Sequence, residues 1–209
     1  MAEPIPRLDP AEVAHWIREQ AAGRGRYVFG IAGPPGCGKS TLAERVGAEL
    51  DAPVLAMDGF HLPNRVLLAR GLLQVKGAPE TFDAAAFVGT VGEIRNATDV
   101  VSCPGFDRTI DAPVADCVRI VPDDTVVVVE GNYLLLEGDP WVSLSGLFDA
   151  IAYLDVPGDI RRERLIARHV EFGRDRVDAV EFVSRSDEAN AALVEASRTR
   201  ADLIVAASN

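Results

Sequence analysis

The segment YVFGIAGPPGCGKST, residues 27–41, decides the fold. Residues 27–33 are mostly apolar and predict a buried strand. The following GPPGCGKST, residues 33–41, matches the pattern G-x-x-x-x-G-K-[ST]. Glycines in this pattern let the backbone turn tightly, so that several N–H groups point toward bound phosphates. A helix predicted for residues 39–50 adds the positive end of its dipole. The segment therefore predicts a phosphate-binding P-loop.

Two side chains of this loop carry specific chemistry. Lys39 is expected to reach the β- and γ-phosphates of ATP, and the hydroxyl of Ser40 to bind Mg²⁺. A GTPase would also carry an N-K-x-D string that reads the base, and the sequence contains none. The residues predicted to bind the nucleotide within the loop are Gly33, Pro34, Pro35, Gly36, Cys37, Gly38, Lys39, Ser40 and Thr41.

Around the P-loop, strands and helices are expected to alternate. The clearest strand is TVVVVE, residues 125–130, because a continuous β-branched run is typical of a parallel strand covered on both faces. Further strands are predicted at 54–57, 100–103, 150–155 and 202–207, and further helices at 9–22, 84–96, 158–172 and 178–196. This alternation predicts an α/β doubly wound parallel sheet flanked by helices, in one domain over residues 1–209. Residues 104–124, rich in Asp and Pro, are expected to form a linker-like excursion beside the substrate.

Composition excludes several classes of protein. A formal net charge of −11 argues against a nucleic-acid partner bound through a broad basic face. The longest apolar runs are too short to cross a membrane. The N-terminus lacks a signal-peptide pattern and the three cysteines form no CxxC pair, so a cytoplasmic location is expected. Cys37 precedes a predicted helix, where a thiol pKa can be lowered, although an inert packed thiol is the simpler interpretation.

Three carboxylates follow predicted strands: Asp58, Glu130 and Asp155. Ligands of open α/β sheets bind at the carboxyl ends of the strands. A carboxylate there can hold Mg²⁺ or accept the proton of an attacking hydroxyl. Each of the three could instead be ordinary polarity at the end of a strand.

Several motifs together resemble one family. The resemblance is to the P-loop kinases that include uridine kinase, phosphoribulokinase and bacterial pantothenate kinase, and within it to bacterial fructose-transport-system kinases. One departure is the segment PGFDR, where Phe106 and Arg108 replace a tyrosine and a histidine of uridine kinases. The motifs that carry the resemblance are GPPGCGKST, MDGFHLPN (57–64), KGAPETFD (76–83), FDR (106–108), VVEGNYLLL (128–136) and RLIARHVEFGRDR (164–176).

The resemblance implies roles for individual residues. Asp58 falls on the catalytic base, and Glu130 on a residue near Mg²⁺ and substrate. The acceptor pocket falls on His61, Lys76, Glu80, Phe106, Asp107 and Arg108, although His61 could equally be a packed loop residue. A helical lid over about residues 158–178 carries Arg164, Arg168 and Arg174, expected to close over the nucleotide and the transferring phosphate; Arg168 is assigned a catalytic role beside Lys39. Each arginine could instead lie on a solvated, salt-bridged helix face.

Three functions remain open at this stage. The first is an ATP-dependent phosphotransferase, with ATP and Mg²⁺ as cofactors, that phosphorylates an alcohol group of a small sugar such as fructose, a nucleoside or a pantothenate-like compound. The second is a partner-dependent P-loop ATPase that acts as a regulator or chaperone. The third is a module that binds ATP without chemistry. Adenine contacts are expected from Asn190 or residues 198–202, and a homodimer is one expectation because relatives are often dimers or tetramers.

Overall fold

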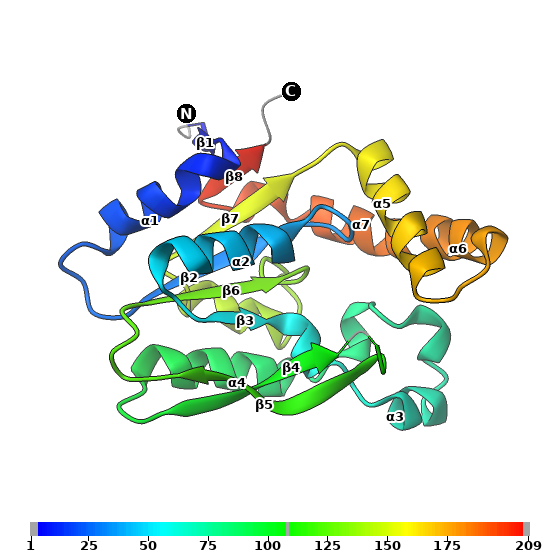
Figure 1. The fold of residues 1–209 in the computed structure, drawn as a ribbon, viewed down its shortest axis with the longest axis horizontal. Coiled ribbons are helices and arrows are strands. Elements are labelled where there is room, and N and C mark those ends of the chain that lie inside the picture. Colours follow the sequence, from blue (N-terminus) through cyan, green and yellow to red (C-terminus); the bar gives the residue numbers. More distant parts are fainter. Residues whose placement is uncertain (1–3, 108, 207–209) are drawn as a thin grey trace.

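A computed structural model describes residues 4–107 and 109–206 of the chain. Its centre is a six-stranded sheet in which every neighbouring pair is parallel (Figure 1). The strands, in spatial order, are β1 (Arg7–Leu8), β8 (Leu203–Ala206), β7 (Ala150–Asp155), β2 (Tyr27–Ala32), β6 (Val126–Gly131) and β3 (Val54–Ala56). The α/β fold with a parallel sheet is therefore confirmed; β1, only two residues long, escaped prediction.

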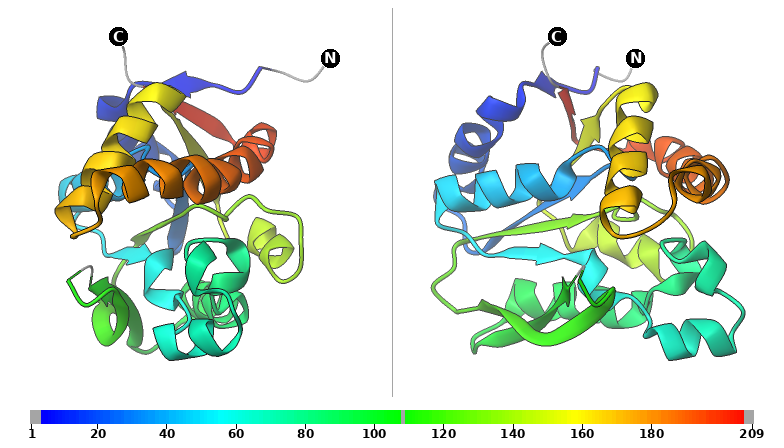
Figure 2. Two further views of the ribbon diagram at one scale, coloured as in Figure 1. Left: turned by 90° about the vertical axis from the view of Figure 1, so that its right-hand side faces the viewer. Right: turned by 45° about the vertical axis from the view of Figure 1, so that its right-hand side comes forward.

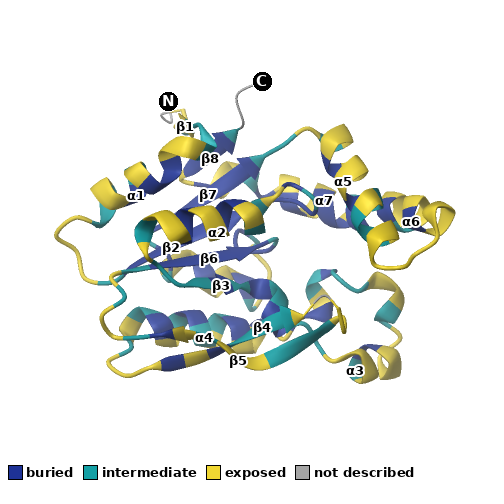
Figure 3. Ribbon diagram, viewed as in Figure 1, coloured by how far each residue is buried: buried dark blue, intermediate teal, exposed yellow. Residues whose placement is uncertain are grey.

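Helices cover both faces of this sheet, and each face has its own apolar core. On one face, α1 (Val13–Ala21) and α2 (Lys39–Leu50) pack against the sheet. On the other face lie α4 (Ala84–Asn96) and α7 (Glu188–Glu195). The central strands β2, β6 and β7 are dark in the burial view because both of their faces are covered (Figure 3). In β6, for example, Val127 and Val129 belong to one core and Val128 to the other, as period-2 alternation requires.

Local sequence signals set several boundaries. Asp9 and Glu12 form a reciprocal capping box around the short 3₁₀ helix Pro10–Glu12 that leads into α1. The predicted bounds of α2 and α4 are those observed. The helix predicted for residues 178–196 is divided into α6 (Arg176–Phe182), a π-helical turn (Val183–Asp187) and α7. Within the described residues, no helix has both the length and the apolarity that crossing a bilayer requires.

The linker-like character predicted for residues 104–124 was wrong, although they do lie outside the main sheet. Strands β4 (Val101–Asp107) and β5 (Ala112–Ile120) form an antiparallel hairpin, in a two-stranded sheet of its own beneath the main sheet (Figure 2). Pro104 and Pro113 obscured this pattern, because proline is normally a sign against a strand. Here the ladder shifts register between Cys103 and Gly105, so Pro104 sits at a bulge, where proline is tolerated.

One carboxylate joins three segments of the fold. Asp149, just before β7, accepts the backbone N–H of Val28 at 2.8 Å and pairs with Arg95 of α4 at 2.9 and 3.2 Å. Burial pushes the pKa of Asp149 upward, but the hydrogen bonds from Arg95 and from Val28 outweigh it and the pKa is lowered. The ionised carboxylate therefore stabilises the junction of β2, β7 and α4.

Replacing Asp149 with Asn should lower the free energy of unfolding at pH 7 by about 2 kcal/mol, because a buried charge-assisted network is lost. Since the folded pKa lies below the unfolded value near ~4, this contribution is present above that value and is lost as pH falls through the folded pKa. Urea unfolding of both proteins at pH 7 and at lower pH measures the difference. Asp123→Asn, an exposed change in the turn before β6, is the control and should stay within about 0.5 kcal/mol of wild type. An unfolding difference that did not shrink in acid would contradict this assignment.

Candidate active site

A cavity of about 370 Å³ opens at the carboxyl ends of the central strands. Its walls include Lys39 and Ser40 of the P-loop and Asp58. Arg168 and Arg174, from α5 (Gly158–Glu171) and the turn after it, line the same cavity. The sequence predicted that Lys39, Ser40 and Asp58 act together, and all three line this cavity.

The P-loop has the backbone that its glycines predict. Gly36 and Gly38 adopt positive φ angles of 77° and 90°, which other residues rarely adopt. A Cβ on Gly36 would also lie 2.7 Å from the carbonyl oxygen of Arg161, so no side chain fits there. The loop closes through a hydrogen bond from the N–H of Cys37 to the oxygen of Pro34, and α2 begins at Lys39.

Ser40 and Glu130 form the polar pair beside the loop. The Ser40 hydroxyl donates to Glu130 Oε1 at 2.8 Å, and Glu130 is 3% exposed at the end of β6. A hydroxyl and a carboxylate are the hard oxygen donors that Mg²⁺ takes from a protein, so the residues fit this ion. Among the described residues, no group of three or more His, Cys, Asp and Glu side chains could hold a metal. Phosphate and water oxygens would therefore complete the coordination.

Asp58 lies in a 3₁₀ turn, Met57–Phe60, directly after β3. The turn packs tightly on the β4–β5 hairpin. A Cβ added to Gly59 would lie only 2.6 Å from the backbone oxygen of Pro104. The backbone oxygen of Asp58 also bonds to His61 Nδ1 at 2.9 Å. The position of the predicted base is thus fixed from both sides.

His61 combines the two interpretations left open by the sequence. Its ring lies 3.9 Å from that of Phe82 and 5.1 Å from that of Phe106, and all three line the cavity. Burial, the largest effect, lowers the pKa of His61, so the imidazole is neutral at pH 7. It is both a packed residue and part of the cavity wall.

The other predicted acceptor residues divide into two groups. Lys76 and Phe106 line the cavity, with Lys76 Nζ 5.3 Å from the centre of the Phe106 ring. Glu80 is exposed and lines a separate cavity, because the short helix Pro79–Thr81 buries Thr81 and turns Glu80 outward. Asp107 is exposed and accepts the N–H of Thr109, outside the described cavity wall. Arg108 lies outside the described residues.

The arginines predicted as lid residues all lie near the P-loop or the cavity. Arg164 donates to the backbone oxygen of Cys37 at 3.3 Å. Arg174 stacks on the ring of Phe182 of α6 at 4.1 Å and, like Arg168, lines the cavity. The movement of this segment as a lid stays a prediction.

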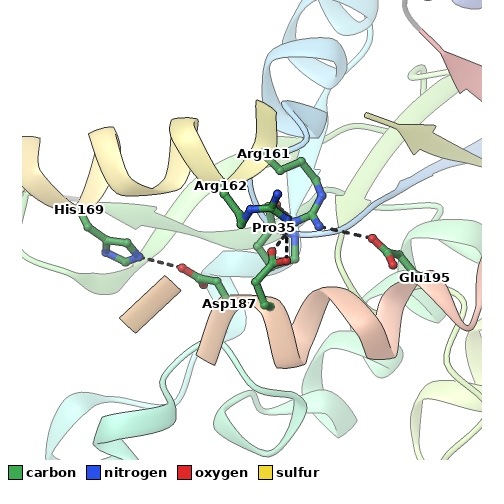
Figure 4. A network of polar contacts seen from close by, with 7 residues as sticks. Pro35, Arg161, Arg162, His169, Asp187 and Glu195 are labelled. Atoms are coloured by element: carbon green, nitrogen blue, oxygen red, sulfur yellow. Dashed lines mark hydrogen bonds and ion pairs between the residues drawn. The ribbon is translucent and has the colours of Figure 1, made fainter. Parts of the chain in front are cut away.

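Arg161, beside these residues, was missed as a site residue by sequence reasoning. Its side chain is 2% exposed and donates to the oxygen of Pro35 in the P-loop at 3.1 Å. It also pairs with Glu188 and Glu195 of α7 at 3.3 and 3.4 Å (Figure 4). The available signal was its position one helical turn before the buried Leu165, on the same face of α5.

His169 of α5 also lines the cavity, although no role was assigned to it from the sequence. Its Nε2 lies 2.9 Å from Asp187, which ends the π-helical turn and lines the cavity as well (Figure 4). Asn132 and Asn190 complete the polar wall. From the sequence, Asn190 was predicted only as a possible contact of the adenine base.

Asp155, the third strand-end acid, plays a different part. Its carboxylate pairs with Arg7 at 3.3 Å and Arg198 at 2.6 Å, and it is not among the described residues of the cavity wall. It ties the N-terminal strand and the 3₁₀ helix Arg198–Arg200 to β7.

Cys37 is an inert packed thiol. It is 2% exposed, and burial raises its pKa despite the nearby charge of Lys39. The alternative of a thiolate activated by the helix N-terminus is therefore wrong.

Comparisons with known proteins agree with this geometry. A protein-family model described as "ATPase family associated with various cellular activities (AAA)" matches residues 29–89, the part that contains the P-loop. The Schizosaccharomyces pombe protein named "Putative uridine kinase C227.14" is 35% identical over 86% of this chain and 83% of its own length. "Pantothenate kinase" of Yersinia pestis (strain Pestoides F) is 33% identical over 70% of this chain and 50% of its own length.

A solved structure extends the likeness to the whole fold. The crystal structure of a "putative fructose transport system kinase" from Silicibacter sp. TM1040 is 37% identical, with a TM-score of 0.87 over 94% of this chain and 98% of that one. The fold and the site thus define a P-loop nucleotide-binding protein of the small-molecule kinase class. The chain belongs to the P-loop kinase family of the uridine kinase and pantothenate kinase type.

Burial predicts how the three thiols react. Cys37 and Cys103 are buried, whereas Cys117 is exposed. A thiol reagent such as DTNB should therefore titrate one cysteine quickly in the folded protein and all three in denaturant, because only exposed thiolates react. Cys117→Ser is the control and should abolish the fast reaction. A fast reaction that survived this change would mean that a buried thiol is accessible.

Arg161→Met should weaken ADP binding about tenfold, because the P-loop loses the side chain that holds the oxygen of Pro35. The matched control is Arg162→Met: Arg162 also pairs with Glu188 but is 46% exposed, so its loss should change ADP affinity less than about twofold. Calorimetric titration with ADP measures both, and thermal unfolding verifies that each variant is folded. Equal ADP affinities in the two variants would refute a role of Arg161 in positioning the P-loop.

Proposed function

We propose that this protein transfers the γ-phosphate of ATP to an alcohol group of a small metabolite. The observation that carries the proposal is that Lys39, Ser40 and Asp58 line one cavity. Lys39 would bind the phosphates of ATP, and Asp58 would receive the proton of the acceptor hydroxyl. Arg168, which lines the same cavity, would stabilise the negative charge of the phosphoryl group during transfer.

In the proposed reaction, the acceptor oxygen attacks the γ-phosphorus of ATP while its proton passes to the carboxylate of Asp58. The bond between the γ-phosphorus and the β–γ bridging oxygen breaks, and ADP leaves with the electron pair. Little covalent help is needed, so orientation and charge compensation by Lys39 and Arg168 supply most of the catalysis. Mg²⁺, held by Ser40 and Glu130, would neutralise phosphate charge when bound.

Relatives suggest several acceptors without deciding among them. Their names refer to uridine, pantothenate and fructose, each of which presents hydroxyl groups. The remaining parts of the proposal rest on the sequence: a single domain, a lid over about residues 158–178, a cytoplasmic location and a homodimer. Arg164 and Arg174, beside the P-loop and the cavity, support the lid.

The first test is ATP consumption with Mg²⁺ against a panel of sugars, nucleosides and pantothenate. Asp58→Asn should lower phosphate transfer by about 10²-fold or more while ATP still binds, because only proton transfer is impaired. Lys39→Ala should abolish transfer altogether. Asp123→Asn, an exposed change outside the described residues of the cavity wall, is the control for the change of charge and should behave as wild type.

Two results would contradict the proposal. If Asp58→Asn transferred phosphate to an identified acceptor at the full rate, Asp58 would not be the base. If every compound left a slow ATP hydrolysis unchanged, and Asp58→Asn left it unchanged too, the partner-dependent ATPase would become the better explanation.

A further inference from the structure

Lys76 is a largely buried cation on the acceptor side of the cavity. Its side chain is 13% exposed and lies against the ring of Phe106, which in turn contacts His61. His61 bonds to the backbone of Asp58. Lys76 and the proposed base Asp58 line the same cavity, so one small molecule bound there can reach both.

The charge of Lys76 is neutralised by an exposed residue of the same chain. Nζ lies 2.7 Å from the carboxylate of Asp111 and 2.6 Å from its backbone oxygen, and Asn64 accepts the remaining hydrogen bond at 2.8 Å. Asp111 lies in the turn between β4 and β5, and its side chain is 63% exposed. It lines the cavity together with Lys76.

Two properties make Asp111 an exchangeable partner. First, an exposed carboxylate gains little from an ion pair because water competes for it. Second, its φ angle of 49° is in the left-handed region, which residues other than glycine adopt uncommonly. Lys76, by contrast, is largely buried and requires an anionic partner at all times. An external anion can therefore replace Asp111 more readily than Lys76 can remain unpaired.

We propose that the phosphate acceptor carries an anionic oxygen group, a carboxylate or a phosphate monoester, which displaces Asp111 and binds Lys76. Asp111 then acts as an internal substitute that occupies the anion position while the cavity is empty of acceptor. This inference rests on the proposed function for the role of the hydroxyl. The anion position itself can be tested without any phosphate transfer.

The first test measures simple anions with the P-loop already filled by Mg²⁺ and a non-hydrolysable ATP analogue. Acetate and inorganic phosphate are titrated separately, and binding is followed by the rise in unfolding temperature. Asp111→Asn should bind at least one of the ions about threefold or more tightly than wild type, because asparagine tolerates the left-handed backbone but carries no competing charge. Adding Lys76→Met should remove the gain.

Asp116→Asn is the matched control. Asp116 is another exposed aspartate of the same hairpin with a positive φ angle, 55°, but it is not among the described residues of the cavity wall. Its replacement should leave both ion affinities unchanged. Equal affinities in wild type, Asp111→Asn and the double variant would overturn the proposal, whatever acceptor is found. The ion that gains more affinity distinguishes a carboxylate from a phosphate position.

The second test compares acceptors in pairs that differ mainly in the anionic group: glycerate with glycerol, and fructose 6-phosphate with fructose. The anionic member should be phosphorylated with a kcat/KM about tenfold or more above its neutral partner, and Lys76→Met should raise its KM. Equal or better use of a neutral member would overturn the inference and leave the kinase intact. If ATP hydrolysis were unaffected by every compound and by Asp58→Asn, the proposed function would be contradicted instead. The ion titration would still show whether an anion binds at Lys76.

Discussion

The parallel pairing of β2 with β6 is the constraint on which the site depends. Its register sets Ile31 beside Glu130, so β6 ends where β2 turns into the P-loop. Glu130 is thereby placed 2.8 Å from the hydroxyl of Ser40. On its other side, β6 pairs with β3 in a register that aligns Glu130 with Ala56, and Asp58 follows two residues later. Two strand registers thus bring together groups that lie 90 residues apart in sequence.

Charge is distributed unevenly in this molecule. The chain carries a net charge of −11, yet the cavity gathers Lys39, Lys76, Arg168 and Arg174. At physiological salt, charges more than about 8 Å apart are largely screened when exposed. An anionic ligand near the cavity therefore responds to the charges of the cavity wall, which also include Asp58, Asp111 and Asp187, rather than to the net charge. The acidic remainder of the surface disfavours extended polyanions without penalising a compact nucleotide.

The sequence predicted those elements whose signals come from neighbouring residues, and it missed those that depend on contacts between distant parts of the chain. The P-loop, α2 and α4 were predicted correctly because their signals are local: a motif, a cap and a periodic apolar face. The β4–β5 hairpin was missed because Pro104 hid a bulge that only strand pairing makes visible.

Tertiary contacts limited the prediction of the site in the same way. The weak helical-spacing signal at Arg161 could not show its contact with Pro35, which lies 126 residues away in the chain. Glu80 lies in a motif that predicted a place in the acceptor pocket. Burial of the neighbouring Thr81 instead turns the Glu80 side chain away from the cavity.

The close contact at Gly36 has a mechanical consequence. The space that a Cβ would need is filled by the backbone oxygen of Arg161, at 2.7 Å, and by Leu165, at 2.8 Å. The first two turns of α5 therefore pack directly against the P-loop, and this packing opposes a pivot at Gly158. If the end of α5 moves as a lid, the bend would lie after Leu165. Arg164 would stay anchored on the loop, whereas Arg168 and Arg174 would travel.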